Sequence, residues 1–396
     1  MQILYYDWDE FNGEDCRDAM RRLGYEVEVY KSTRDVLDYT DELFQSVNAR
    51  IQAAEKAGHP FDLIFSFNFF PNLSEICAKI NMRYVSWVFD CPHKTLCSYN
   101  VSNSVNEIHI FDRRMCDDLK EKGINTVRHT PLAVNEERLR KLCEDLDKET
   151  MGFRTYEHEV SFIGNLYDNE FNFYDQITTM PDALKNDVDA VINAQEKVFS
   201  VDFFTDESIV NTVHIKKIRD YISFENSGKY DINYDEVILD MLRKKVTVNE
   251  RRHILEKMGE RFDTVLYTAG DVRPIPGICN LGYADYTTRM PRVFRRSKIN
   301  LNITLRSIRS GIPLRVLDVL AAGGFLITTT NPEIEENFED GYDLAIARTP
   351  EEMLAKAEYY LEHDDERQQI AINGQKKVFD NYAYSRLLPQ IIGKVL

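Results

Sequence analysis

The sequence predicts an α/β protein made of two Rossmann-like domains, the second of which carries a helical insertion. Short apolar runs alternate with segments of helical spacing along most of the chain, which is typical of parallel sheets covered by helices. The 396 residues exceed what one hydrophobic core usually supports. Residues 295–330 hold a β-rich run, a Gly-containing loop, a helix opened by Pro313 and a second buried run. We therefore expect this βαβ unit to organise the second domain.

The amino-acid composition limits which partners and which cellular compartment we expect. The chain is 43% hydrophobic and 29% charged, which indicates a folded globular protein. A net charge of −17 disfavours nucleic acids and anionic membranes as partners, although a local basic pocket would suffice for a nucleotide. Seven cysteines without regular spacing indicate a reducing compartment. With no signal-like start and no apolar run of ~18 residues, we expect a cytoplasmic protein without a transmembrane segment.

The first domain is expected over residues 1–150. The order strand, loop, helix, Gly24, strand at its start is the opening of a Rossmann-like domain. The nearly continuous apolar run at 84–89 is typical of a strand that a parallel sheet buries on both faces. A highly charged stretch at 135–158 is interpreted as the domain boundary. The predicted strands are 3–6, 26–30, 62–67, 84–89, 107–111 and 125–129.

The second domain is expected over 151–380, with the final segment 381–396 crossing back to the first. No strand pattern occurs between about 170 and 262, which predicts a helical insertion. Helices are expected at 237–242, 251–258, 350–362 and 365–379. The predicted strands are 159–163, 264–267, 280–283, 299–304, 325–329 and 343–347.

The start of the helix opened by Pro313 is a candidate anion site. Backbone N–H groups at Leu314 and Arg315 would face a phosphate just beyond a strand's carboxyl end, and the Arg315 guanidinium suits it as well. Asp318, one turn later, shares a face with Arg315 and has the oxygens to bind ribose hydroxyls. An ordinary surface ion pair explains the same spacing.

Polar residues on the strand that feeds this helix are further candidates. Lys298, Asn300 and Asn302 alternate and so share one face, where they either contact a ligand or form an internal hydrogen-bond network. Arg306, in the following loop, either reaches a diphosphate or is solvated.

Beyond these patterns, the chain resembles a known family. The runs that carry the resemblance are SKINLNIT, GIPLRVLDVLAAGGFLIT and FEDGYDLAIARTPEEMLAKAEYYLEHDDERQQIAINGQKKVF, with YVSWVFDCPH in the first domain. They resemble GT-B glycosyltransferases of the CgeB-like (spore maturation protein) branch of the glycosyl transferases group 1 families. The resemblance implies the GT-B fold, in which the two Rossmann-like domains face each other across a cleft. It also suggests a bacterial context.

The resemblance implies transfer of a hexosyl group from a nucleotide-diphosphate sugar, a UDP-sugar first of all, to a hydroxyl of a glycan or protein. It implies a ribose role for Asp318, places Gly164 and Asn165 beside the donor phosphates, and places Tyr283 near the base. An ordinary turn explains Gly164 equally well. Ser310 occupies the position where the wider family has a Glu that touches the donor sugar, which leaves the donor sugar and the stereochemistry open. Oligomeric state is also open.

Catalytic and acceptor-side candidates lie at strand ends of the first domain. Asp90 is either a general base for the acceptor hydroxyl or part of an Asx turn before Pro92. His93 either shares the work of the base, contacts the donor phosphate or is a satisfied loop residue. Asp7, Asp9 and Asn12 follow the first strand and either line the cleft or are solvated.

No cofactor and no metal are expected. The D-x-D pattern of Asp7 and Asp9 recurs elsewhere in this acidic chain, so it is a weak metal signal. Cys91, His93 and Cys97 match no usual zinc spacing.

Two other functions are compatible with the sequence. A nucleotide-sugar epimerase or hydrolase would use the same fold with water or the bound intermediate in place of an acceptor. A catalytically silent GT-B-like module would bind a glycan or a partner. Ser310 favours these alternatives, whereas Arg315 and Asp318 favour retained donor binding.

Overall fold

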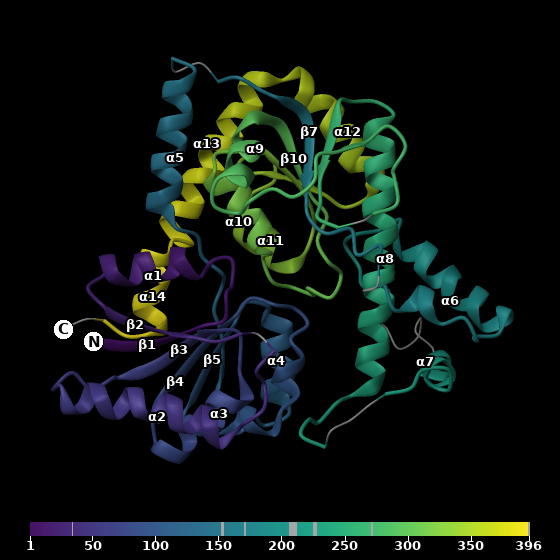
Figure 1. The fold of residues 1–396 in the computed structure, drawn as a ribbon. Coiled ribbons are helices and arrows are strands. Elements are labelled where there is room, and N and C mark those ends of the chain that lie inside the picture. Colours follow the sequence, from purple (N-terminus) through teal and green to yellow (C-terminus); the bar gives the residue numbers. More distant parts are fainter. Residues whose placement is uncertain are drawn as a thin grey trace. The chain divides into compact units, whose positions relative to one another are not determined.

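The computed structural model describes residues 1–33, 35–151, 154–169, 172–205, 212–224, 228–270 and 272–394. The chain forms two compact units (Figure 1). The first holds the described residues of 1–136, 226–231 and 380–396, and the second those of 137–225 and 232–379. Parts of the predicted insertion, at 170–171, 206–211 and 225–227, lie outside the described residues.

The first unit is built on a parallel six-stranded sheet with the order β2-β1-β3-β4-β5-β6. Its central strands β3 and β4 are buried along their whole length, as the apolar runs predict. The strands are β1 (Gln2–Asp7), β2 (Glu26–Lys31), β3 (Leu63–Phe67), β4 (Tyr84–Val88), β5 (Asn106–Ile110) and β6 (Val127–His129).

Helices complete the first unit, together with the C-terminal segment. Tyr384, at the start of the last helix, packs its ring edge-on against Trp87 of β4, 5.8 Å away. Arg83 donates to the carbonyl oxygen of Ile392 at 2.7 Å. The helices are α1 (Gly13–Arg22), α2 (Asp41–Lys56), α3 (Pro71–Ile80), α4 (Arg113–Glu121) and α14 (Tyr384–Ile391), with short 3-10 turns η1 (Lys94–Cys97) and η2 (Tyr99–Ser102).

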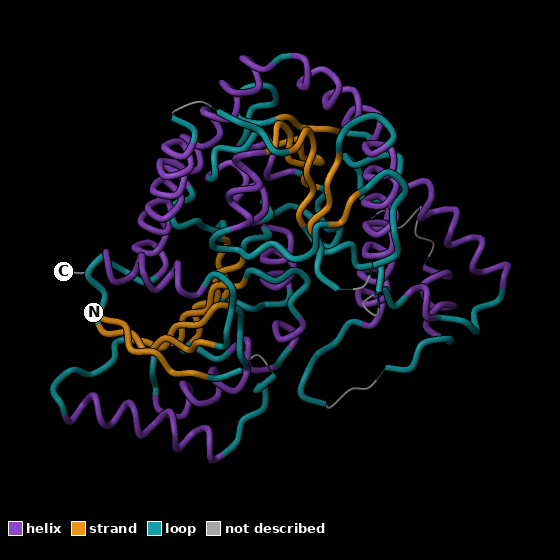
Figure 2. The backbone as a smooth tube through the Cα atoms, turned by 45° about the horizontal axis from the view of Figure 1, so that its top comes forward, coloured by secondary structure: helices purple, strands orange, loops and turns teal. Residues whose placement is uncertain are grey.

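The second unit has its own parallel six-stranded sheet, with the order β12-β11-β10-β7-β8-β9. Figure 2 shows the strands, in orange, gathered into these two sheets. The two-sheet α/β class predicted from the sequence is therefore confirmed. The strands are β7 (His158–Ile163), β8 (Thr264–Tyr267), β9 (Cys279–Asn280), β10 (Ser297–Asn302), β11 (Leu326–Thr329) and β12 (Ala345–Ala347).

The helices of the second unit fall into a sheet-covering set and an insertion between β7 and β8. The sheet-covering helices are α9 (Arg289–Arg296), α10 (Leu314–Ala321), α11 (Pro332–Asn337), α12 (Pro350–Glu362) and α13 (Asp364–Asn381). The insertion contains α6 (Asp182–Gln195), α7 (Thr212–Arg219) and α8 (Tyr234–Gly259), with the short turns η3 (Tyr174–Gln176) and η4 (Phe203–Thr205). The two short helices predicted at 237–242 and 251–258 are thus one continuous helix, α8.

Much of the charged stretch at 135–158, the predicted domain boundary, forms α5 (Glu136–Glu149). Leu139, Cys143 and Leu146 recur at helical spacing and are buried, which gives the helix one apolar face despite its many charges. Residues 137–149 group with the second unit, so the chain divides after Glu136, the first residue of this helix.

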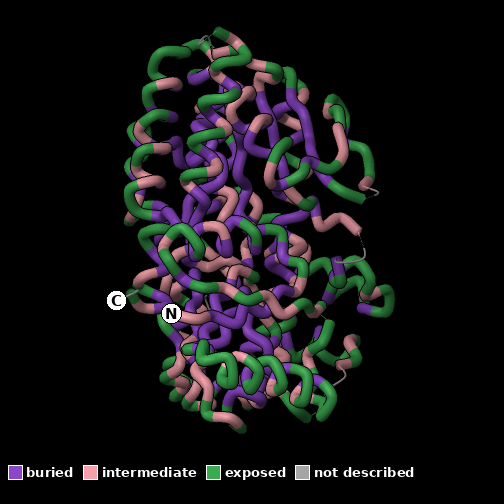
Figure 3. Tube along the Cα trace, turned by 60° about the vertical axis from the view of Figure 1, so that its left-hand side comes forward, coloured by how far each residue is buried: buried purple, intermediate pink, exposed green. Residues whose placement is uncertain are grey.

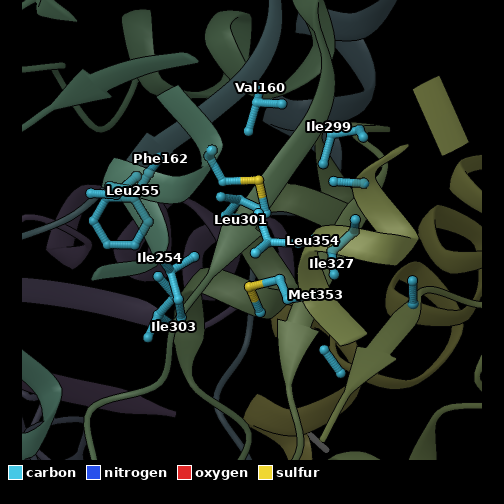
Figure 4. Close-up of a cluster of buried hydrophobic side chains, with 14 of the residues drawn as sticks. Val160, Phe162, Ile254, Leu255, Ile299, Leu301, Ile303, Ile327, Met353 and Leu354 are labelled. Atoms are coloured by element: carbon cyan, nitrogen blue, oxygen red, sulfur yellow. The ribbon is translucent and has the colours of Figure 1, made fainter. Parts of the chain in front are cut away.

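Each sheet lies within a hydrophobic core. In Figure 3 the buried segments, in purple, follow the strands, and exposed segments, in green, follow the outer turns of helices. Figure 4 shows the core of the second unit, where Val160 and Leu301 of the sheet lie among Ile254 of α8 and Met353 of α12. One end of α8 therefore belongs to this core. Its other end packs with α6 in a separate cluster that includes Val188, Ile238 and Leu242.

Candidate functional site

The β10-α10-β11 unit forms as predicted, with its helix starting at a strand's carboxyl end. Pro313 is the extended N-cap residue of α10, and no side chain caps the helix. The N–H of Val316 donates to the carbonyl oxygen of Pro313 at 3.0 Å, so the N–H groups of Leu314 and Arg315 are the ones that can face another acceptor. Gly323, with φ +70°, ends the helix. A Cβ atom on Gly324 would lie 2.6 Å from the carbonyl oxygen of Phe294, so only glycine allows this close packing.

Arg315 and Asp318 lie together on the first turns of α10. Nη1 of Arg315 is 3.6 Å from Oδ2 of Asp318, and the guanidinium lies over the ring of Phe294 at 5.3 Å. Oδ1 of Asp318 accepts a hydrogen bond of 3.1 Å from the hydroxyl of Tyr286. The carboxylate is thereby held in one orientation by partners from two elements. Tyr286, which the sequence analysis did not single out, supports the predicted ribose-binding residue.

The strand that feeds α10 carries an internal polar network. The amide nitrogen of Asn302 donates to the hydroxyls of Thr304 and Thr328, at 3.0 and 2.9 Å. Asn300 donates to backbone carbonyls of Phe294 and Phe325. Both amides are therefore occupied within the protein, which supports the structural interpretation over direct ligand contact. Lys298 is partly exposed on the same strand.

Arg306 does not lie in the solvated loop that the sequence suggested. Its guanidinium forms an ion pair with Glu250 of α8, in which Nε lies 3.0 Å from Oε1, and its Nη2 donates to the carbonyl oxygen of Val198. Glu250 is 2% exposed, so this pair is buried. The pair anchors the loop after β10 to the insertion, and Arg306 has a structural partner in place of the predicted diphosphate.

A second guanidinium, that of Arg251 on α8, reaches the carboxyl ends of two strands. Nε and Nη2 donate to the carbonyl oxygen of Ile303, at 3.1 and 2.6 Å, and Nη1 donates to the carbonyl oxygen of Asn165. Ile303 directly follows β10, and Asn165 lies in the loop after β7. Arg251 is 8% exposed. The insertion therefore supplies a buried cation to the edge of the sheet where α10 begins.

The Arg251 side chain is a buried positive charge whose hydrogen bonds go to neutral carbonyl oxygens. Burial lowers its pKa from the ordinary value and nearby Arg315 lowers it further, whereas Tyr167 and Glu250 act in the opposite direction; an arginine stays charged at neutral pH in any case. Among the residues that the structure describes, no carboxylate forms an ion pair with it. A buried charge without an ionic partner costs several kcal/mol. An anion bound between Arg251 and Arg315 would offset that cost.

The sequence contains a signal for Arg251 in the spacing of its neighbours on α8, although Arg251 was not among the predicted site residues. Val248, Arg251 and Leu255 lie at helical spacing, and both apolar neighbours are fully buried. A charged residue on the apolar face of a helix is expected to have a specific partner.

The remaining donor-side candidates lie at loops of this unit. Gly164 continues β7, where its N–H bonds the carbonyl oxygen of Tyr267, and Asn165 is exposed. Asn165 accepts a hydrogen bond of 2.6 Å from the N–H of Tyr167. Tyr283 follows β9 and is 64% exposed. Leu314 is the half-buried first residue of α10.

In the first unit, Asp90 follows β4 with an exposed carboxylate that has a fixed orientation. Asn68 donates from its amide nitrogen to Oδ2 of Asp90 at 2.8 Å, and its amide oxygen accepts from the N–H groups of Phe89 and Asp90. Asn68 itself has a left-handed backbone, with φ +58°, which asparagine tolerates better than most residues. The structure thus presents Asp90 as an available base.

His93 has the features of a satisfied loop residue. Its Nε2 lies 3.2 Å from the backbone nitrogen of Phe69 and 2.6 Å from the hydroxyl of Thr95. Burial lowers the pKa of His93, against the opposing effect of Asp90. The neutral ring ties the loop after β4 to the end of β3, and this tie supports a positioning role for His93.

The three predicted acceptor-side residues differ in how far they are buried. Asp7 is 2% exposed and forms ion pairs with Arg17 and Lys31, at 2.9 and 2.7 Å, so it is neither solvated nor presented to a ligand. Asp9 is exposed, with φ +68°. Asn12 is buried at the start of α1. Asp7 is thus a structural residue.

The described residues contain no group of three or more His, Cys, Asp or Glu side chains arranged to hold a metal ion. Nor does the described part of the chain contain a helix long and apolar enough to cross a bilayer.

Comparisons with known proteins give a family match for part of the chain and none among curated sequences. Residues 244–393, which include Arg251 and all of α10, match a family model described as glycosyl transferase-like. No curated protein sequence matches the chain.

Two solved structures share the fold. A glycosyltransferase from Rickettsia africae ESF-5 is 10% identical, over 98% of this chain and 96% of that chain, with a TM-score of 0.50. A sucrose-phosphate synthase from Thermosynechococcus elongatus is 9% identical, over 98% of this chain and 97% of that chain, with a TM-score of 0.52. The chain has the GT-B fold of two Rossmann-like α/β units, as predicted. The CgeB-like branch stays a prediction.

Proposed function

We propose that this protein is a glycosyltransferase that transfers a hexosyl group from a nucleotide-diphosphate sugar, a UDP-sugar first of all, to an acceptor hydroxyl. One observation carries the proposal. Arg251 is a buried cation that donates to carbonyl oxygens at the carboxyl ends of β7 and β10, and it forms no ion pair among the described residues. A diphosphate is the ligand whose charge matches two guanidinium groups and an uncapped helix start.

The reaction uses these groups to stabilise the leaving diphosphate. The acceptor oxygen forms a bond to the anomeric carbon while the bond between that carbon and the diphosphate oxygen breaks. The electron pair of the broken bond remains on the diphosphate, where Arg315, Arg251 and the start of α10 would stabilise it. Fixed cations supply the stabilisation that other enzymes obtain from a metal, so we expect activity without one. Asp318, oriented by Tyr286, would bind the ribose.

The acceptor proton needs a base, and Asp90 is the group proposed for it. Its carboxylate is exposed and oriented by Asn68. Accepting the proton as the new bond forms would typically contribute a factor of 10²–10⁴ to the rate.

Calorimetry with UDP, GDP, dTDP and CMP, each with and without Mg²⁺, tests the donor site. We expect one nucleotide to bind without metal and to bind at least about tenfold more weakly to Arg315→Ala. If none of the four binds, the donor site is refuted and the silent binding module becomes the better description. Incubation with the matching sugar nucleotides then shows whether a sugar is transferred.

A hydrolase or epimerase on this fold is the second candidate, and one observation favours it. Ser310, in place of the expected sugar-contacting Glu, donates its hydroxyl to Oε1 of the buried Glu333 at 2.8 Å. The contacts to the donor sugar therefore differ from those that the resemblance implies. Free sugar or an epimerised nucleotide sugar as the main product, without any transfer product, would select this candidate.

A further inference from the structure

Three aromatic rings of the first unit form a cluster beside Asp90, which we call the aromatic shelf: Trp8, Phe11 and Phe89. The rings of Trp8 and Phe89 are stacked, with centroids 5.9 Å apart and planes at 18°. Phe11 meets Phe89 edge-on, at 5.3 Å and 69°. Trp8 and Phe11 come from the loop after β1, and Phe89 directly follows β4. The shelf thus lies at the carboxyl ends of these two strands.

The shelf is rigid and reaches solvent. The indole nitrogen of Trp8 donates to the carbonyl oxygen of Phe67 at 2.9 Å, which fixes the ring. The N–H of Phe89 donates to the amide oxygen of Asn68 at 3.1 Å. Phe11 is 48% exposed although it is a large apolar residue. A preformed, exposed aromatic surface of this kind is a common feature of ligand sites.

Polar groups lie next to the aromatic shelf, in the loops that follow the same two strands, β1 and β4. Asp90 is the residue after Phe89, and its carboxylate is exposed and hydrogen-bonded by Asn68. Asp9, between Trp8 and Phe11 in the chain, is exposed as well. Apolar ring faces next to fixed hydrogen-bond acceptors match a ligand that has both an apolar face and hydroxyl groups.

We infer that the aromatic shelf binds a pyranose ring of a saccharide acceptor, with Asp90 accepting a hydrogen bond from the hydroxyl that is glycosylated. A pyranose presents C–H groups on its faces and hydroxyls at its edge. The faces pack on aromatic rings, and the edge reaches the carboxylate. This inference rests on the proposed function and names its acceptor class.

The charges around the shelf disfavour other acceptors. Two exposed carboxylates, Asp9 and Asp90, would repel a phosphorylated or carboxylated acceptor. A serine or threonine side chain offers a hydroxyl but no apolar ring face to cover Phe11. The shelf therefore selects a neutral saccharide over a phospholipid or a peptide.

Tryptophan fluorescence gives a direct measurement, because the chain has two tryptophans and the other one, Trp87, is fully buried. The full-length protein is titrated with methyl glycosides of glucose, galactose, mannose and N-acetylglucosamine and with their disaccharides. A threonine-containing peptide and glycerol serve as comparison ligands. We expect at least one saccharide to change the Trp8 emission and the comparison ligands to leave it unchanged.

Variants of Phe11 test whether its ring is needed for saccharide binding. Phe11→Ala and Phe11→Leu should weaken saccharide binding roughly tenfold, whereas Phe11→Tyr, which keeps the ring, should retain it. Tyr99→Ala, which removes another exposed aromatic ring of the same unit, is the matched control and should bind like the parent.

Two outcomes would overturn the inference: no saccharide of the panel binds, or Phe11→Ala and Phe11→Leu bind saccharides as the parent does. Calorimetry of the same variants with the donor nucleotide separates this inference from the proposed function. Nucleotide binding without saccharide binding refutes the shelf alone, whereas failure of all nucleotides refutes the proposed function.

Discussion

Arg251 and Ile303 are joined by two hydrogen bonds, because Nε and Nη2 of the guanidinium both donate to one carbonyl oxygen, at 3.1 and 2.6 Å. Arg251 belongs to the insertion helix α8, and Ile303 directly follows β10, the strand that leads toward α10. The insertion is therefore part of the proposed donor site, not an appendage to it.

Replacing Arg251 by glutamine should weaken nucleotide binding at least about tenfold, since a hydrogen bond to a charged group contributes about 1.5–3 kcal/mol. Calorimetry measures the affinity, and urea unfolding measures the change in stability. Arg243→Gln is the matched control, because Arg243 is a buried arginine of the same helix that pairs with Asp202 at 3.1 Å. Equal loss of affinity in both variants would contradict a specific role for Arg251.

Replacing Asp318 by alanine should abolish discrimination between UDP and 2′-deoxy-UDP. If the carboxylate accepts a hydrogen bond from the ribose, the parent should favour UDP by about tenfold or more. Tyr286→Phe removes the 3.1 Å hydrogen bond to Asp318 and should reduce this preference without abolishing it. A parent that binds both nucleotides equally well would refute the ribose role.

Replacing Asp90 by asparagine should reduce turnover 10²–10⁴-fold with little change in nucleotide affinity, because the base acts on the acceptor. The measurement is the initial rate of transfer at saturating donor. Asn68→Ala leaves the carboxylate in place but removes the 2.8 Å hydrogen bond that orients it, so an intermediate loss is expected. Full activity of Asp90→Asn would exclude Asp90 as the base.

The loss of folding stability in acid should depend in part on Glu107 of β5. His109, with Nε2 at 3.6 Å, and the 2.7 Å ion pair with Arg83 lower the pKa of Glu107 to about 2. The unfolded chain, with an ordinary glutamate pKa of about 4.3, binds more protons between these two values. The contribution of Glu107 to the free energy of unfolding is therefore fully present above about pH 5 and is lost as the pH falls toward 2.

Glu107→Gln should lower the free energy of unfolding at pH 7 and flatten its pH dependence in that acidic window. Urea unfolding at pH 7, 4 and 3 measures both effects. Glu28→Gln removes one partner of an exposed ion pair with Arg50. It should change the free energy of unfolding by no more than about 1 kcal/mol at each of these pH values. An unchanged acid slope in Glu107→Gln would contradict the pKa assignment.

The sequence by itself determined most of the strands and several of the helices, with their order, because these depend on local patterns. The helix predicted at 350–362 is observed over Pro350–Glu362, and the strand predicted at 26–30 is observed over Glu26–Lys31. Pro313 and the Gly323-Gly324 pair marked the limits of α10. Apolar spacing and backbone-restricting residues act within a few positions, so one sequence contains this information.

The tertiary structure decided which polar side chains meet. Arg251 reaches Ile303, Arg306 pairs with Glu250, and Asp7 pairs with Arg17 and Lys31. Nothing near Arg306 or Asp7 in the sequence indicates whether its charge has a partner in the fold, because the partner lies on another element. The charge balance of a site depends on such distant pairs, and this is why the sequence offered only a ligand or solvent for Asp7 and Arg306 and did not identify the partners of Arg251.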